Sequence, residues 1–179
     1  MIFIKITGVI FIIVSSSFYG FYRAQKIKFH INDLYQISNA LEILESEIKF
    51  GVTPLDEAVK NICERSKFFV KEFFLDINRL LKDKKKSASK IWLESTDNIY
   101  KNHKKYNKNF LDKEDILLIN LFSNVISNPD PELQRKYISK INIGLQKKIL
   151  ILEKKHQNEK KLSYNLGFLF GLLIITIFI

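Results

Sequence analysis

Apolar residues are concentrated at the two ends of this chain. Residues 6–22 read ITGVIFIIVSSSFYGFY and residues 162–179 read LSYNLGFLFGLLIITIFI, and neither segment carries a charge. The second segment is apolar on every face and, as a helix, spans about 27 Å, enough to cross the hydrocarbon core of a bilayer. We therefore predict an N-terminal membrane anchor over residues 1–22 and a C-terminal transmembrane helix over residues 162–179. A cleaved signal peptide is the alternative for the first segment, although the basic region before it is minimal.

The region between these segments, residues 23–161, has the periodicity of amphipathic helices. Gly and Pro number only six and three in the whole chain, which favours long helices over strands and turns. The predicted fold class is therefore all-α, with a six-helix bundle between the two membrane helices. The clearest apolar seam has spacings of three, four, three and four residues, at Leu34, Ile37, Leu41, Leu44 and Ile48.

Capping signals mark where several of these helices begin. Asp112 is placed to cap a helix that covers residues 116–126, with Asp115 at the acidic position of a capping box. Asp130 is placed to cap the last helix, and Pro131 suits its first position. No later proline interrupts that helix, so it is expected to continue into the C-terminal apolar segment. The other predicted signals are a stop at Gly51, a restart at Thr53 with Pro54 as the first helical residue, and a cap at Ser87 or Ser89.

Basic residues crowd the inner flank of both apolar ends. Arg23, Lys26 and Lys28 follow the first segment, and six lysines lie between positions 147 and 161. Lys and Arg next to membrane helices are enriched on the cytoplasmic side. We therefore predict that the central domain is cytoplasmic and that both termini lie outside. The net charge of +10 would suggest nucleic-acid binding in a soluble protein, but the apolar ends make a membrane location the first explanation.

Both apolar segments contain small residues four positions apart. Ser16 and Gly20 have this spacing in the first segment, and Gly167 and Gly171 have it in the second. Small residues at such a spacing let two membrane helices approach closely, although the spacing is also common by chance. These four residues are the candidates for packing between membrane helices.

No constellation of residues indicates catalysis, a metal site or a cofactor site. The chain has no phosphate-binding Gly-rich loop, no HExxH and no CxxC motif. His30, His103 and His156 lie in polar, basic surroundings and are expected to be exposed to solvent. Cys63 is the single cysteine and is expected to be buried on a helix face, since nothing points to the partners that a nucleophile would need. We therefore predict that the protein is not an enzyme.

Two lysine-rich stretches, residues 82–86 and 101–108, allow more than one interpretation. The second stretch also contains His103 and Tyr106. Basic and aromatic residues together can bind single-stranded nucleic acid. They can also attract anionic lipid or an acidic protein, or form an ordinary solvated surface, which is the first expectation here.

Two motifs resemble those of a known family. Residues 47–55, EIKFGVTPL, resemble the E-I-x-Y-x-x-T-P-L stretch of the stage III sporulation protein AB family, and residues 165–173, NLGFLFGLL, resemble its C-terminal S-L-G-F-L-x-G-L-L. The chain length, the two-anchor layout and the glycines Gly8 and Gly20 also fit, so the resemblance covers essentially the whole chain. Phe50 stands where the family usually has Tyr, and residues 82–113 are more lysine-rich than the family pattern.

The resemblance implies a fold similar to the cytoplasmic domain of type II secretion system F proteins. It further implies a non-enzymatic platform role in the stage III sporulation A channel that links mother cell and forespore, in the mother-cell-derived membrane around the forespore. The implied partners are a stage III sporulation protein AA-like ATPase, the other stage III sporulation A membrane proteins, membrane lipid and a second copy of the chain. The alternative is a membrane-anchored helical protein that binds nucleic acid or anionic lipid, with nucleic acid the less expected partner.

An acidic group of residues is the candidate docking surface for the ATPase. Glu42, Glu45 and Glu47, with the turn at Phe50-Gly51, lie at one end of the first predicted helix of the central domain. Acidic residues on an otherwise basic domain can select a partner of complementary charge. The alternative is that Glu47 and Phe50 only brace the turn before Thr53.

Overall fold

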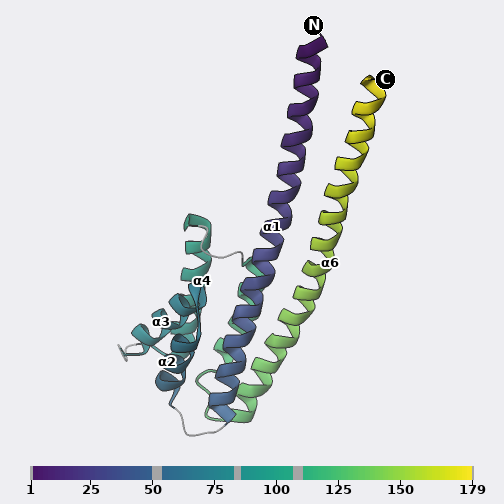
Figure 1. The fold of residues 1–179 in the computed structure, drawn as a ribbon. Coiled ribbons are helices and arrows are strands. Elements are labelled where there is room, and N and C mark those ends of the chain that lie inside the picture. Colours follow the sequence, from purple (N-terminus) through teal and green to yellow (C-terminus); the bar gives the residue numbers. More distant parts are fainter. Residues whose placement is uncertain (1, 50–53, 83–85, 107–110, 179) are drawn as a thin grey trace. The chain divides into compact units, whose positions relative to one another are not determined.

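In the computed structural model, every described element is a helix (Figure 1). The structure describes residues 2–49, 54–82, 86–106 and 111–178. The predicted all-α fold class is therefore confirmed for this part of the chain. The elements are α1 (Ile2–Lys49), α2 (Leu55–Arg65), α3 (Phe68–Lys82), α4 (Ala88–Tyr106), α5 (Lys113–Asn120), the short 3₁₀ helix η1 (Leu121–Asn124) and α6 (Pro131–Phe178).

The two terminal helices are much longer than the others, at 48 residues each. The N-terminal anchor and the seam that begins at Leu34 were predicted to be separate helices. This prediction was wrong, because α1 runs through both. The eight residues after Tyr22, RAQKIKFH, contain neither Gly nor Pro, so nothing there ends a helix. The expectation of one helix from Pro131 into the C-terminal segment is confirmed by α6.

Among the residues that the structure describes, no helix combines the length and the apolar character needed to cross a bilayer. The two predicted membrane helices are therefore not supported by this finding.

The chain divides into two compact units. Residues 1–29 and 150–179 form unit 1, and residues 30–149 form unit 2. In unit 2, helices α2, α3, α4 and α5 pack on one another in chain order. Hydrogen bonds and ion pairs between α1 and α6 in unit 2 join Ser38 to Asn142 and Glu45 to Arg135, which makes the two helices antiparallel there.

Unit 2 encloses an apolar core. The predicted seam of α1 faces this core, and its residues Leu34, Leu41 and Leu44 are at most 1% exposed. Trp92 of α4 is also 1% exposed. Its ring meets the rings of Phe73 and Phe122 edge to face, at centroid distances of 5.2 and 5.0 Å. Its indole N–H donates to the carbonyl of Ile119 at 3.1 Å, so the polar edge of the ring is satisfied.

Most of the predicted helix starts are confirmed. Asp112 caps α5 and forms a reciprocal capping box with Asp115. The carboxylate of Asp130 accepts the Glu132 N–H at 2.9 Å, and Pro131 is the first residue of α6. Of the two serine candidates, Ser87 lies at the start of α4, and its hydroxyl accepts the N–H of Lys90. Pro54 precedes the first helical residue of α2 instead of filling that position, and Gly51 and Thr53 lie outside the described residues.

The fifth helix is shorter than predicted. The sequence predicted a helix to Ile126, but α5 ends at Asn120 and continues as η1. At this point side chains donate hydrogen bonds to backbone carbonyls. The Trp92 indole N–H donates to the carbonyl of Ile119, and the Ser123 hydroxyl donates to the carbonyl of Asn120. Leu117, in the middle of α5, is 68% exposed, so this helix lies at the surface of the core.

Unit 1 joins the start of α1 to the end of α6 through polar contacts. The guanidinium of Arg23 lies 3.0 Å from the carboxylate of Glu159, and the Nδ1 atom of His156 lies 3.0 Å from the carbonyl oxygen of Ala24. Beyond these contacts, large apolar side chains of α1 face outward, with Phe11 and Phe18 each 72% exposed. In the described part of unit 1, polar contacts thus join α1 and α6, and large apolar side chains of α1 are exposed.

Candidate functional site

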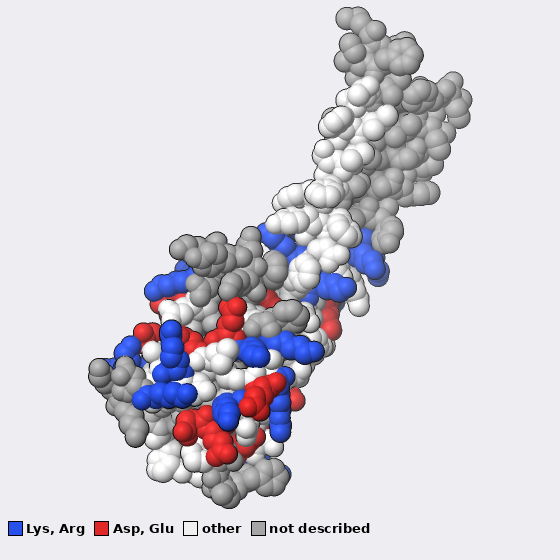
Figure 2. Space-filling model, turned by 60° about the vertical axis from the view of Figure 1, so that its left-hand side comes forward, with Lys and Arg blue, Asp and Glu red and all other residues white. Residues whose placement is uncertain are grey.

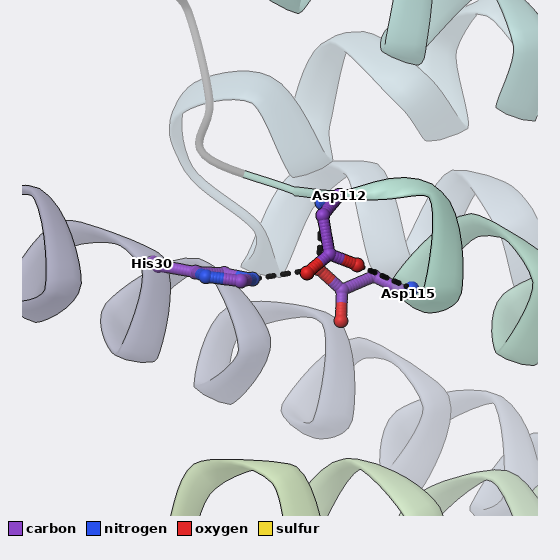
Figure 3. A group of neighbouring side chains, drawn as sticks. All are labelled: His30, Asp112 and Asp115. Atoms are coloured by element: carbon purple, nitrogen blue, oxygen red, sulfur yellow. Dashed lines mark hydrogen bonds and ion pairs between the residues drawn. The ribbon is translucent and has the colours of Figure 1, made fainter. Parts of the chain in front are cut away.

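The densest cluster of charged side chains in unit 2 surrounds the start of α5. His30 comes from α1, Asp112 and Asp115 from the capping box of α5, and Lys148 from α6. Figure 3 shows the His30 ring directed at the Asp115 carboxylate, with Asp112 beside it; the Nε2–Oδ2 distance is 2.6 Å. The Lys148 ammonium lies 2.7 Å from an oxygen of Asp112 and 2.8 Å from Asp115 Oδ1. We call these four residues the charge cluster.

The electrostatics of the charge cluster favour its ionised form. Asp115 is fully buried, and burial raises the pKa of its carboxyl, but hydrogen bonds from His30, Lys148 and the Asp112 N–H outweigh burial and leave that pKa below its ordinary value. Burial likewise lowers the pKa of Lys148, but its hydrogen bonds to Asp112 and Asp115 outweigh burial and leave that pKa raised. The buried carboxylate is stabilised in its charged form because three donors surround it, one of them the Lys148 ammonium.

These shifts define when the charge cluster stabilises the fold. Because the pKa of Asp115 is lowered on folding, its contribution is complete above the ordinary value of 3.8 and is lost as pH falls through the folded value. Because the pKa of Lys148 is raised, its contribution is complete below the ordinary value of 10.5 and is lost as pH rises through the folded value. At neutral pH both contributions are present.

Three members of the charge cluster have the geometry of metal ligands. One ligand atom each from His30, Asp112 and Asp115 can be chosen so that all lie within 4.8 Å of one another. However, the ammonium of Lys148 contacts both carboxylates and offsets part of their charge. A divalent cation would have to displace this ammonium. The residues therefore fit an internal ion-pair network better than a metal site. Their ion pairs connect α1, α5 and α6.

The charge cluster was not predicted from the sequence. The histidines were expected to be exposed, which was wrong for His30, whose side chain is only 12% exposed, and for His156, which is partly buried. The side chain of His103 lies outside the described residues. The capping-box position of Asp115 was the only local signal, because His30 lies 85 residues away in the sequence. Only tertiary packing brings the two together.

The predicted docking acids differ in how available they are. Glu42 is exposed, whereas Glu45 and Glu47 are partly buried. The carboxylate of Glu45 lies 3.7 Å from Arg135 Nε, and that of Glu47 accepts a hydrogen bond of 3.1 Å from Asn61. The contact of Glu47 with α2 agrees with its alternative role as a brace. Phe50 and Gly51 lie outside the described residues, so the turn itself is not placed.

Tertiary structure brings two further acidic residues, Asp130 and Glu132, next to Glu45. A shallow hollow of about 550 Å³ is lined by Glu45 together with Asp130 and Glu132 from the start of α6, and also by Arg135 and Lys136. Arg135 pairs with Glu132 at 2.6 Å as well as approaching Glu45. Much of the charge in the hollow is therefore compensated internally, which leaves Glu42 as the acid best placed to meet a partner.

Two described lysines of the lysine-rich stretches pair with acidic side chains of α4. The acids are Glu94 and Asp97 of α4. Lys86 lies 2.5 Å from Glu94, and Lys101 lies 2.5 Å from Asp97. On the face drawn in Figure 2, basic and acidic side chains are interspersed over the helices. Such mixing is typical of a solvated surface, whereas a nucleic-acid site shows a stripe of one sign.

Cys63 is buried on α2, as predicted. Burial raises the pKa of its thiol, which disfavours the thiolate that a nucleophile needs. Of the residues predicted to pack membrane helices, Gly20 is partly exposed in α1. Ser16, Gly167 and Gly171 belong to α1 and α6, but their surroundings lie outside the described residues.

Comparison with known proteins gives consistent matches. The family model described as stage III sporulation protein AB matches residues 5–179. A curated relative, stage III sporulation protein AB of Bacillus subtilis (strain 168), is 26% identical over 174 residues, which cover 97% of this chain and 98% of the relative. A solved structure of stage III sporulation protein AB (SpoIIIAB) superposes with a TM-score of 0.64 at 22% identity and covers 72% of this chain and 97% of that chain. The last likeness concerns the fold alone.

Proposed function

The chain belongs to the stage III sporulation protein AB family, and from this we propose that it is a non-enzymatic membrane platform subunit of the stage III sporulation A channel. In this proposal, unit 2 lies in the cytoplasm and docks a secretion-type ATPase. The apolar ends of α1 and α6 hold the protein in the mother-cell-derived membrane around the forespore. The protein would thus contribute position and contacts, and no reaction of its own.

The observation that carries this proposal is the exposed apolar surface of unit 1. Phe11, Phe18 and Tyr19 are each more than 60% exposed and lie within a segment that carries no charge. An apolar helix surface of this kind is normally covered by lipid or by other apolar helices. The basic residues that follow this segment support a cytoplasmic position for unit 2.

The proposed contact with the ATPase rests on Glu42. This residue is exposed on α1, next to a seam whose apolar residues are buried, so it can be changed without disturbing the core. Reversal of Glu45 would place two cations together, because Arg135 is close to it. Glu42 alone therefore gives the cleaner test of a charge-dependent contact.

The test is co-purification of the AA-like ATPase from sporulating cells with full-length protein that carries Glu42→Lys. We expect several-fold less ATPase, with unchanged thermal melting, since exposed charges contribute little to stability. In the unmutated protein the same contact should weaken as salt rises. Glu64→Lys is the matched control, because it reverses an exposed acid on α2. Normal recovery of the ATPase with Glu42→Lys would place the docking surface elsewhere.

A further inference from the structure

A hollow on α6 within unit 1 combines cationic and apolar residues. Its volume is about 380 Å³. Its lining residues extend over about three turns of the helix. Along α6 it lies between Leu150, where unit 1 begins on this helix, and the uncharged C-terminal segment that begins at Leu162. Its lining residues are Ile151, Lys154, Lys155, Asn158, Glu159 and Leu162.

The polar side of this hollow presents donors. Lys154, Lys155 and Asn158 are all exposed, so two ammonium groups and one amide are available to a ligand. The one acid in the lining, Glu159, is only 18% exposed and pairs with Arg23 of α1 at 3.0 Å. Because Arg23 compensates this carboxylate, the net charge that the hollow offers to a ligand is positive.

The apolar side of the hollow is exposed as well. Ile151 is 67% exposed and Leu162 is 56% exposed, and they lie at opposite ends of the lining. Leu162 lies on the same side of the two ammonium groups as the uncharged C-terminal segment, so a ligand with a charged head and hydrocarbon chains can contact the lysines and Leu162 together. A small inorganic anion would use the lysines and leave Leu162 without a role.

The rest of unit 1 carries the same combination of residues. On α1, Tyr19 and Tyr22 are exposed, and the Lys26 ammonium lies 4.7 Å from the centre of the Tyr22 ring. Exposed tyrosines beside Lys and Arg are typical of the interface between a membrane and water. This second helix therefore places the hollow at the level of lipid headgroups.

We propose that the hollow binds the headgroup of an anionic phospholipid. Lys154 and Lys155 contact its phosphate, Asn158 donates a hydrogen bond to it, and Leu162 contacts the first carbons of the acyl chains. The inference rests on the membrane location proposed above and adds the class of lipid. Its role is to fix the position of α6 at the membrane surface.

The test measures binding of phosphatidylglycerol to the full-length protein in an uncharged detergent, by native mass spectrometry. Each lysine near anionic lipid contributes enough that Lys154→Gln with Lys155→Gln should weaken binding about 10- to 30-fold. The control is Lys140→Gln with Lys147→Gln, which removes the same charge from exposed positions of the same helix. Gln and Lys have similar helix propensities, so both variants should fold. The control variant should bind phosphatidylglycerol nearly as well as the unmutated protein.

Three outcomes would overturn the inference. Binding of phosphatidylcholine as tightly as phosphatidylglycerol would show that the site does not recognise the negative charge of the headgroup. Equal weakening in the control variant would show a general effect of charge with no local site. Displacement of the lipid by inorganic phosphate at millimolar concentration would identify a small-anion site instead. None of these outcomes bears on recovery of the ATPase with Glu42→Lys, so failure of the lipid site and failure of the proposed function remain distinguishable.

Discussion

The two units of this chain place their apolar side chains in opposite ways. In unit 2, α1 turns Leu34, Leu41 and Leu44 inward, where they are at most 1% exposed. In unit 1, the same helix carries Phe11 and Phe18, which are each 72% exposed. One continuous helix thus has a seam that the protein itself covers and a segment that it leaves open.

This difference follows from the distribution of charge along α1. Residues 34–48 alternate apolar positions with Glu, Asn and Ser, so the helix has one face for a protein core and another for water. Residues 6–22 have no such polar face, so no single protein contact can cover the helix all round. The seam residues Leu34, Leu41 and Leu44 are thus covered by the protein itself, whereas the described apolar side chains of residues 6–22 are exposed.

The largest expected effect is on the core of unit 2. Leu41→Asp would bury a charge without a partner and should destabilise the fold by about 4 kcal/mol or more, enough to unfold many domains of this size. Phe18→Asp is the matched change in unit 1, and it should leave the helical signal and the melting of unit 2 unchanged while it reduces recovery in the membrane fraction. Circular dichroism melts and cell fractionation of both full-length variants check this. Equal loss of helicity in both would abolish the distinction between the units.

An intermediate effect is expected for the charge cluster. Lys148→Met removes the ammonium that contacts Asp112 and Asp115, and it should destabilise unit 2 by about 3 kcal/mol because the Asp115 carboxylate stays buried. Adding Asp115→Asn should restore part of this loss, since the uncompensated charge is then gone. Lys140→Met on the exposed side of α6 is the control and should change stability by less than about 0.5 kcal/mol. Urea denaturation of the three variants measures these differences, and a Lys148→Met protein as stable as the control would refute the structural role of the cluster.

The smallest effect on unit 2 is expected from the glycines of the C-terminal segment. Gly167→Leu with Gly171→Leu adds two bulky side chains on one face of α6, so helices that pack through this face should separate. Assembly measured by crosslinking in the membrane should be lost, while membrane recovery and the melting of unit 2 should stay as they were. Leu169→Ala with Leu173→Ala, at the same spacing but on a different face, serves as the control. Unchanged crosslinking and unchanged sporulation would mean that the small-residue spacing is incidental.

Local signals explain why so much of the fold could be predicted. The capping box at Asp112 and Asp115, the cap at Asp130 with Pro131, and the seam from Leu34 to Leu44 all act within a few residues of the chain. The end of α5 could not be predicted in this way. It depends on Trp92 and its hydrogen bond to Ile119, a residue 27 positions away. The continuity of α1 through the N-terminal boundary was missed because hydrophobicity changes there while helix propensity does not.

The sequence by itself determined the helical class, most helix starts, the buried seam and the family, because each depends on short-range spacing or on a linear motif. Tertiary structure alone decided the partners of the charged groups. From the sequence, Asp115 is the acidic residue of a capping box. In the fold, its buried carboxylate also lies at the centre of an ion-pair network. Glu45 and Glu47 are equivalent acids in the sequence, yet one meets Arg135 and the other Asn61. The physical reason is that helix propensity and capping act over one or two turns, whereas an ion pair requires two distant segments to be brought within about 4 Å of each other.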